Sequence, residues 1–167
     1  MELINFKGND YPKLQSEGFA SQYAFPFARK ILSGLGVDVG CMKREWAFEG
    51  SIPVDIDFDN GYHAAHLPEG LFNYIFSSHC LEHLPIWVDI LRYWHSKLYE
   101  GGTLFLYLPN MDYQVYWRCW HNRKHFAHLN PSILKMYFED NQDMWNVSFV
   151  TEGYDLNGSF YAVATKK

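Results

Sequence analysis

Val37-Asp38-Val39-Gly40-Cys41 decides the fold together with Val54-Asp55-Ile56-Asp57 further along the chain. The first stretch is typical of a buried strand that ends in a glycine turn, and the second of a strand that ends in an acid. A glycine lets the backbone approach a ligand closely, and an acid after the second strand can accept hydrogen bonds from a ribose diol. Together they predict a nucleotide-type site at the carboxyl edge of a parallel sheet.

The rest of the chain alternates between strand and helix patterns. Continuous apolar runs predict further strands, and apolar residues at helical spacing predict a helix that a Gly-Gly pair ends. The expected strands are 36–39, 52–56, 72–78, 103–108, 144–151 and 159–165, and the expected helices are 27–32, 84–98 and 131–139. We therefore expect an α/β fold with a Rossmann-like, mainly parallel sheet and an antiparallel C-terminal strand pair.

The length of 167 residues suits a single domain that covers 1–167. We divide it into an irregular N-terminal arm or lid, a cofactor-binding core, a substrate loop, and a closing helix with a hairpin. Their expected ranges are 1–33, 34–110, 111–130 and 131–167.

Composition excludes several classes of partner. The net charge of -5 and the lack of a basic stripe disfavour a nucleic acid. No apolar run is long enough to span a bilayer, so no membrane partner is expected. The three cysteines are odd in number and far apart, which favours reduced thiols in a cytoplasmic protein. Aromatic residues make up 19% of the chain, and they can form either a core of large rings or the walls of a pocket.

Three blocks of sequence resemble the class I S-adenosylmethionine-dependent methyltransferases, in particular a compact, methyltransferase type 11-like subgroup. They are VDVGC at 37–41, VDID at 54–57, and FNYIFSSHCLEHL at 72–84 followed by KLYEGGTLFLYLP at 97–109. The resemblance implies S-adenosyl-L-methionine as cofactor. It also implies methyl transfer to an oxygen or nitrogen of a small molecule or a sugar or glycan precursor.

The chain departs from that family pattern at the first crossover. The glycine turn carries Gly40 followed by Cys41, and Asp38 and Asp55 are only 55 − 38 = 17 residues apart. A reduced first crossover and a thinned glycine turn leave an alternative open, namely a catalytically inactive, methyltransferase-like binding or regulatory protein. A dinucleotide-dependent oxidoreductase is disfavoured because the chain lacks a G-x-G-x-x-G motif.

Asp55 is the strongest candidate for cofactor binding, as the acceptor of the ribose hydroxyls, and Asp57 replaces it if the register slips by two. The resemblance implies further contacts to the methionine part and to adenine. The complete predicted cofactor set is Asp38, Gly40, Cys41, Lys43, Asp55, Ile56, His63, Leu67, Ser77 and Ser78.

Two histidines, His79 and His83, are the candidate catalytic residues, because a neutral imidazole beside the transferred methyl can take a proton from a substrate hydroxyl. The predicted substrate contacts are Tyr11, Tyr113, Trp117, His125 and His128. Two metal sites are conceivable, one on the two catalytic histidines and one on Cys119, His121, His125 and His128. The rings of His79 and His83 share a face only if the following helix begins early, and the second cluster lacks the paired ligands of a structural zinc site, so we predict no metal.

Overall fold

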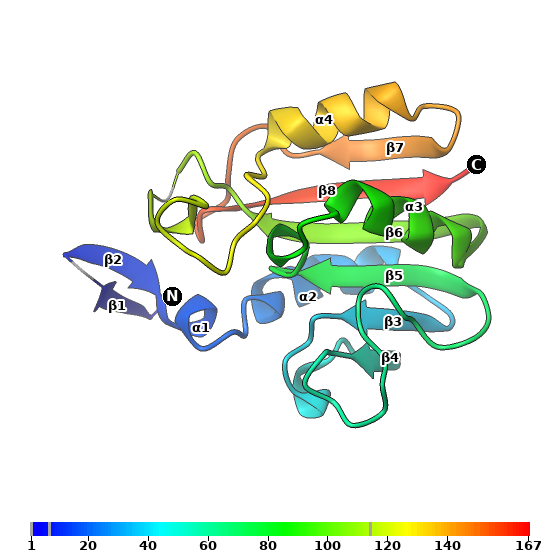
Figure 1. Cartoon of the computed structure of the whole chain (residues 1–167), viewed down its shortest axis with the longest axis horizontal. Helices are drawn as coiled ribbons and strands as arrows, with labels where there is room; N and C mark the ends of the chain where they lie inside the picture. The colour runs from blue at the N-terminus through cyan, green and yellow to red at the C-terminus, as the bar shows by residue number, and fades with distance from the viewer. Residues whose placement is uncertain (1, 7, 114) are drawn as a thin grey trace.

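The computed structural model describes residues 2–6, 8–113 and 115–167, with the side chains of Phe6, Asn9 and Val115 left out. A six-stranded sheet forms its centre, in the order β4-β3-β5-β6-β8-β7 (Figure 1). β3, β4, β5 and β6 run parallel, and β8 lies antiparallel to both β6 and β7. The strands are β3 (Gly36–Val39), β4 (Ser51–Val54), β5 (Phe72–Ser78), β6 (Leu98–Pro109), β7 (Trp145–Val150) and β8 (Ser159–Lys166). The predicted mixed sheet with an antiparallel C-terminal pair is confirmed.

Apolar side chains on both faces hold the central strands in place. In β5, Tyr74, Ile75 and Phe76 are at most 2% exposed, which is why the strand reads as a continuous apolar run. On one face pack α3 (Trp87–Ser96) and α4 (Pro131–Asp140), and on the other packs α2 (Ser21–Ile31) (Figure 1). The sheet is therefore the middle of three layers.

The N-terminal segment is more regular than predicted. A hairpin of β1 (Leu3–Phe6) and β2 (Asn9–Pro12) leads into α1 (Lys13–Ser16), and α2 begins at Ser21 rather than at position 27. The expectation of an irregular arm was wrong, because Pro26 lies inside α2 without ending it. Burial of Ala24, Phe25 and Ala28 against the sheet outweighs the hydrogen bond that a proline cannot donate.

The predicted helix over 84–98 is also wrong in its bounds. A 3₁₀ turn, η2 (Leu81–His83), precedes α3, and β6 already begins at Leu98. Gly101 and Gly102 therefore lie within β6 rather than ending a helix. A Cβ on Gly102 would lie 2.8 Å from the carbonyl oxygen of Tyr99, so this glycine permits a close backbone approach rather than a helix stop.

The first crossover is short, as the sequence predicted. Between β3 and β4 the chain forms only η1 (Arg44–Trp46), and β4 ends at Val54, two residues before the predicted end. The chain moves from β3 to β4 on one side and then to β5 on the other side of β3. Such a switch point opens a crevice at the carboxyl ends of parallel strands, where ligands bind.

Among the described residues, the helices are all too short or too polar to cross a membrane.

Candidate active site

A cleft of about 1120 Å³ opens at the carboxyl ends of β3, β4 and β5. Its floor includes Gly40, Asp55 and His79, each of which directly follows a strand. The N-terminal segment and the segment between β6 and α4 lie at this end of the sheet (Figure 1), and they contribute Tyr11 and Trp117 to the wall.

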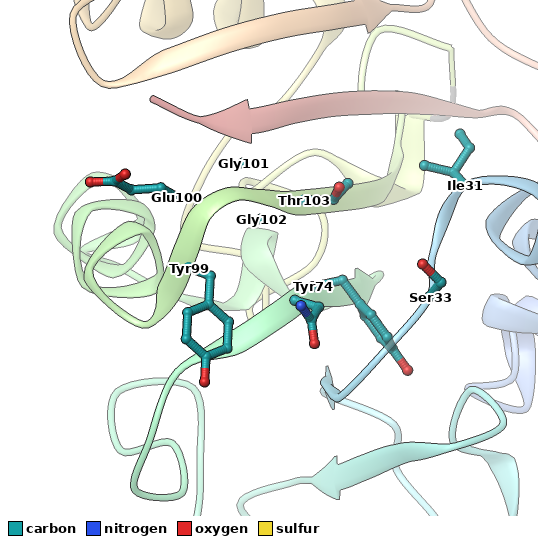
Figure 2. A pocket seen from close by; sticks show the side chains of 9 residues that line it. Ile31, Ser33, Tyr74, Tyr99, Glu100, Gly101, Gly102 and Thr103 are labelled. Carbon is teal, nitrogen blue, oxygen red and sulfur yellow. The ribbon is translucent and has the colours of Figure 1, made fainter.

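A second, much smaller pocket lies at the opposite edge of the sheet. Figure 2 shows Tyr74, Tyr99 and Thr103 around it, near the amino ends of β5 and β6. Its volume is about 190 Å³, too small for a nucleoside and remote from the glycine turn. The larger cleft is therefore the candidate active site.

The glycine turn forms a bend of bare backbone in the cleft. Gly40 has a φ of +84°, and its N–H donates to the carbonyl of Val54 over 2.8 Å. The side chain of Cys80 packs against Gly40. Any other residue at this bend would be strained, because the conformation favours glycine.

Asp55 ties the end of β4 to this bend. Its Oδ2 accepts a hydrogen bond from the backbone N–H of Met42 over 2.7 Å, and its Oδ1 accepts one from Asp57 over 3.2 Å. Each carboxylate oxygen has more than one lone pair, so both oxygens can still accept from a ligand. The structure therefore places an oriented carboxylate where the sequence predicted the ribose contact.

Three further predicted cofactor residues also line the cleft. Ile56 is 79% exposed at the cleft surface, and His63 also lines the cleft, with its Nδ1 accepting a hydrogen bond from the N–H of Ala65. The Oγ atom of Ser78, at the end of β5, is buried and has no hydrogen-bond partner among the described residues. A buried hydroxyl of this kind favours a ligand that supplies the missing bond.

Asp38 does not line the cleft, contrary to its predicted contact with the cofactor. It is 1% exposed within β3, and its Oδ2 accepts a hydrogen bond from the N–H of Phe48 over 2.7 Å. Burial raises the pKa of Asp38 to about 7. Its role in the structure is to hold the short crossover against the sheet.

Four other predicted cofactor residues also lie outside the cleft lining. Cys41 and Leu67 are buried in the protein, and Ser77 donates its hydroxyl to a β3 carbonyl over 3.0 Å. The Nζ of Lys43 lies 3.9 Å from the ring centre of Trp46, away from the cleft. For Ser77 the side that faces the cleft depends on the strand register, because alternate strand positions face opposite layers, whereas Cys41, Lys43 and Leu67 lie in irregular connections without such a period.

His79 follows β5 in the left-handed region, with a φ of +49°. Its Nε2 is hydrogen-bonded to Oγ of Ser159 over 2.9 Å, and its Nδ1 lies 3.9 Å from Oε1 of Glu82. Burial lowers the pKa of His79 to about 3, so the imidazole is neutral and keeps a lone pair. Strained conformations of this kind gather at functional sites.

A group of three side chains adjoins His79: Glu82, His83 and His125. Oε1 of Glu82 lies 3.8 Å from Nε2 of His83, and the ring centres of His83 and His125 are 4.7 Å apart. Burial raises the pKa of Glu82 to about 7 and lowers that of His125 to about 4. The sequence analysis missed Glu82, although its position directly before His83 was a usable signal.

Two of the predicted substrate residues form an aromatic wall beside this group. The indole N–H of Trp117 donates to the hydroxyl oxygen of Tyr11, and their ring centres are 5.7 Å apart. Tyr113 and His128 lie elsewhere: Tyr113 stacks on Tyr154, and His128 bonds to Asp112 over 3.0 Å. Neither of these two lines the cleft.

Comparison with known proteins decides the family. The family described as "Methyltransferase domain" matches residues 20–142. The chain belongs to this methyltransferase family. It is thus an S-adenosylmethionine-dependent enzyme, as the resemblance of its three sequence blocks implied. No curated protein matches the methyltransferase significantly.

Solved structures with low sequence identity share the fold of this methyltransferase. A chain from the complex of the Haloferax volcanii Trm112 methyltransferase activator has a TM-score of 0.66 at 14% identity, with 92% of each chain covered. An S-adenosylmethionine-dependent methyltransferase from Archaeoglobus fulgidus has a TM-score of 0.61 at 15% identity, covering 92% of this chain and 98% of that one. Magnesium protoporphyrin IX methyltransferase from Synechocystis, solved with bound S-adenosylhomocysteine, has a TM-score of 0.60 at 15% identity and covers 98% and 89%.

The residues of the cleft fit this cofactor. The bare backbone at Gly40 permits a close approach, the Asp55 carboxylate suits a diol, and the Ser78 hydroxyl lacks a partner among the described residues. The volume of about 1120 Å³ leaves room for an acceptor beside a nucleoside.

Proposed function

We propose that this methyltransferase methylates an oxygen or nitrogen atom of a small molecule, with a sugar or glycan precursor as the leading acceptor class. One observation carries the proposal: a single cleft is lined both by the Asp55 carboxylate and by the imidazoles of His79 and His83. The part of the cleft beside His79, here called the acceptor end, has an aromatic wall of Trp117 and Tyr11, which suits stacking on a ring.

The cofactor would lie across the switch point between β3 and β5. Asp55 would accept a hydrogen bond from each of the two ribose hydroxyls, and Ile56 and His63 would pack against the adenine. Gly40 would pass along the methionine part, with Ser78 offering its hydroxyl nearby. Asp38, Cys41, Lys43, Leu67 and Ser77 support these elements from outside the lining.

S-adenosylmethionine supplies an electrophilic methyl group on a positively charged sulfur. The protein must then hold the acceptor in line, exclude water and remove the acceptor's proton. We assign the proton to Nδ1 of His79, while Nε2–H remains bonded to Ser159. Tyr11 and Trp117 would exclude water from the acceptor end, and His83 would face the acceptor from η2.

Two segments would close over the bound ligands. The N-terminal segment 2–33 and the loop 111–130 both contribute cleft residues, and the core between them would carry the cofactor contacts. Closure by such segments is a common way to shield a reaction from water. The free thiols of Cys41, Cys80 and Cys119 suit the reducing cytoplasm, which we propose as the location.

A binding or regulatory protein without activity is the second candidate. The observation that favours it is the crossover between β3 and β4, which is reduced to η1. Such a protein would bind S-adenosylhomocysteine weakly or not at all, or would bind it without turnover.

Calorimetry and a transfer assay test the proposal together. We expect the wild-type protein to bind S-adenosylhomocysteine. We also expect it to form S-adenosylhomocysteine from S-adenosylmethionine when a panel of hydroxyl- and amine-bearing sugars is supplied. Binding of S-adenosylhomocysteine without its formation from S-adenosylmethionine across the panel would favour the second candidate. Absence of both binding and product formation would contradict the proposed function.

A further inference from the structure

Glu82, His83 and His125 present one ligand atom each to a common point beside the cleft. These three atoms lie within 4.8 Å of one another. Two imidazole nitrogens and one carboxylate oxygen form a donor set that suits Zn²⁺ and related divalent ions. Three protein ligands would leave a fourth position open toward the acceptor end of the cleft.

Backbone carbonyls fix the orientation of both imidazoles. Nδ1–H of His83 donates to the carbonyl of Lys124 over 2.8 Å, and Nδ1–H of His125 donates to the carbonyl of Trp117. Each ring therefore carries its lone pair on Nε2. Histidines that bind metals are typically held in this way, with the other ring N–H donated to a carbonyl or carboxylate.

The backbone of the same turn holds the loop that carries His125. The carbonyl of Glu82 accepts from Phe126 and Ala127 over 2.8 and 3.1 Å. Backbone bonds thereby join Glu82 to a residue 44 positions away (126 − 82 = 44), directly after His125. The turn that carries Glu82 and His83 and the loop that carries His125 are therefore already held together by backbone hydrogen bonds.

The Glu82 carboxyl group is buried without sufficient partners. The residue is 1% exposed, and its Oε2 has no hydrogen-bond partner among the described residues. In that part of the chain, its ion-pair contacts are to His79 and His83 at 3.9 and 3.8 Å. A buried carboxylate without a hydrogen-bonded cation is costly, and a bound dication would relieve that cost.

We propose that Glu82, His83 and His125 bind a divalent first-row transition-metal ion of the Zn²⁺ type. Tetrahedral ligands of Zn²⁺ lie roughly 3.4 Å apart, so the side chains must rotate inward from their separations of up to 4.8 Å. The metal takes the lone pair of His125 Nε2, which in this structure accepts from Nδ2 of Asn122 over 3.1 Å.

The consequence for the reaction rests on the proposed function. An acceptor hydroxyl at the open metal position loses its proton more readily, because the ion stabilises the resulting oxyanion. The proton passes to Nδ1 of His79. The oxygen then forms a bond to the methyl carbon as the carbon–sulfur bond breaks, leaving a neutral thioether. The metal thereby favours a hydroxyl acceptor over an amine.

Metal titration of the chelator-treated full chain tests the site. We expect Zn²⁺ to bind in calorimetry with one ion per chain, and Co²⁺ to give a visible absorption spectrum typical of imidazole ligands. His83→Asn keeps an N–H near the Nδ1 position for Lys124 but removes Nε2, so it should lower Zn²⁺ affinity about 100-fold or more. Glu82→Gln, which keeps the size of the side chain, should have a similar effect.

His121→Asn is the matched control, because His121 lines the cleft on the same loop but lies outside the three-residue group. It should leave Zn²⁺ affinity within about threefold, the scatter expected of a non-ligand. Equal Zn²⁺ affinity in wild type, His83→Asn and Glu82→Gln would overturn the proposal, as would a lack of binding. Circular dichroism checks that each variant is folded. S-adenosylhomocysteine binding, measured separately without metal, tests the proposed function alone.

Discussion

Cys80 occupies the space that a side chain at position 40 would need. A Cβ on Gly40 would lie 2.5 Å from the Cβ of Cys80 and 2.7 Å from its Sγ. The bend after β3 and the residue after His79 are therefore packed so closely that only glycine fits between them. This contact fixes the distance between the two strand ends that frame the cleft.

The first prediction concerns Gly40→Ala. We expect it to lower the free energy of unfolding by about 2–4 kcal/mol, from backbone strain and overpacking together. It should also weaken S-adenosylhomocysteine binding. Gly50→Ala is the control, since Gly50 has a φ of +78° with no atom within 4 Å of the added Cβ. That variant should lose only the strain, about 1–2 kcal/mol. Equal losses in urea denaturation would contradict the packing argument.

The second prediction concerns Asp55→Ala. The variant should bind S-adenosylhomocysteine with about 1.5–3 kcal/mol less free energy, the scale of hydrogen bonds to a charged group. Asp57→Ala removes the neighbouring cleft carboxylate and should change the dissociation constant much less. Calorimetry measures both. A larger loss in Asp57→Ala would assign the ribose contact to Asp57 instead.

The third prediction concerns the pH dependence of stability. The pKa of Asp38 rises from 3.8 to about 7 on folding, so the folded protein binds this proton more tightly. The stabilising contribution is complete below about pH 4 and is lost as the pH rises through 7. Between these values the wild type should lose about 1.4 kcal/mol per pH unit relative to Asp38→Asn. Urea denaturation of both proteins from pH 5 to 8 measures this difference, and parallel curves would refute it.

The fourth prediction concerns His79→Gln. A glutamine can keep the hydrogen bond to Ser159, so the variant should fold and bind S-adenosylhomocysteine as the wild type does. Methyl transfer should fall by about 10²–10⁴-fold if His79 accepts the proton. Ser159→Ala, which leaves the ring but frees its Nε2, should lose less activity. Full activity in His79→Gln would remove His79 from the proposed mechanism.

Local sequence was sufficient for the sheet and for the position of the cleft. The apolar run of β5 and the short gap between β3 and β4 predicted both the central strands and the missing crossover helix. Local sequence did not predict the start of α2 correctly, because a helix can retain a proline such as Pro26 when its other face is buried. Propensity is local, whereas the burial that decided α2 comes from strands far along the chain.

The composition of the cleft was less predictable than its position. Asp55 could be placed at the cleft because the carboxyl ends of parallel strands all lie at the same edge of the sheet. The position of Glu82 before His83 was a signal, but its environment depends on His125 on a distant loop, which local sequence does not show. Tyr113 and His128 were expected at the substrate, but their own partners, Tyr154 and Asp112, draw them away from the cleft.

The two hydrogen bonds from Phe126 and Ala127 to the carbonyl of Glu82 also have an evolutionary consequence. They use only main-chain atoms, so they persist with any side chains other than proline at positions 126 and 127. Outward residues of the loop can therefore change while His125 stays next to Glu82. A chimera that grafts another such loop between Trp117 and Ala127 but retains His125 should acquire a new substrate range while His79 remains the base.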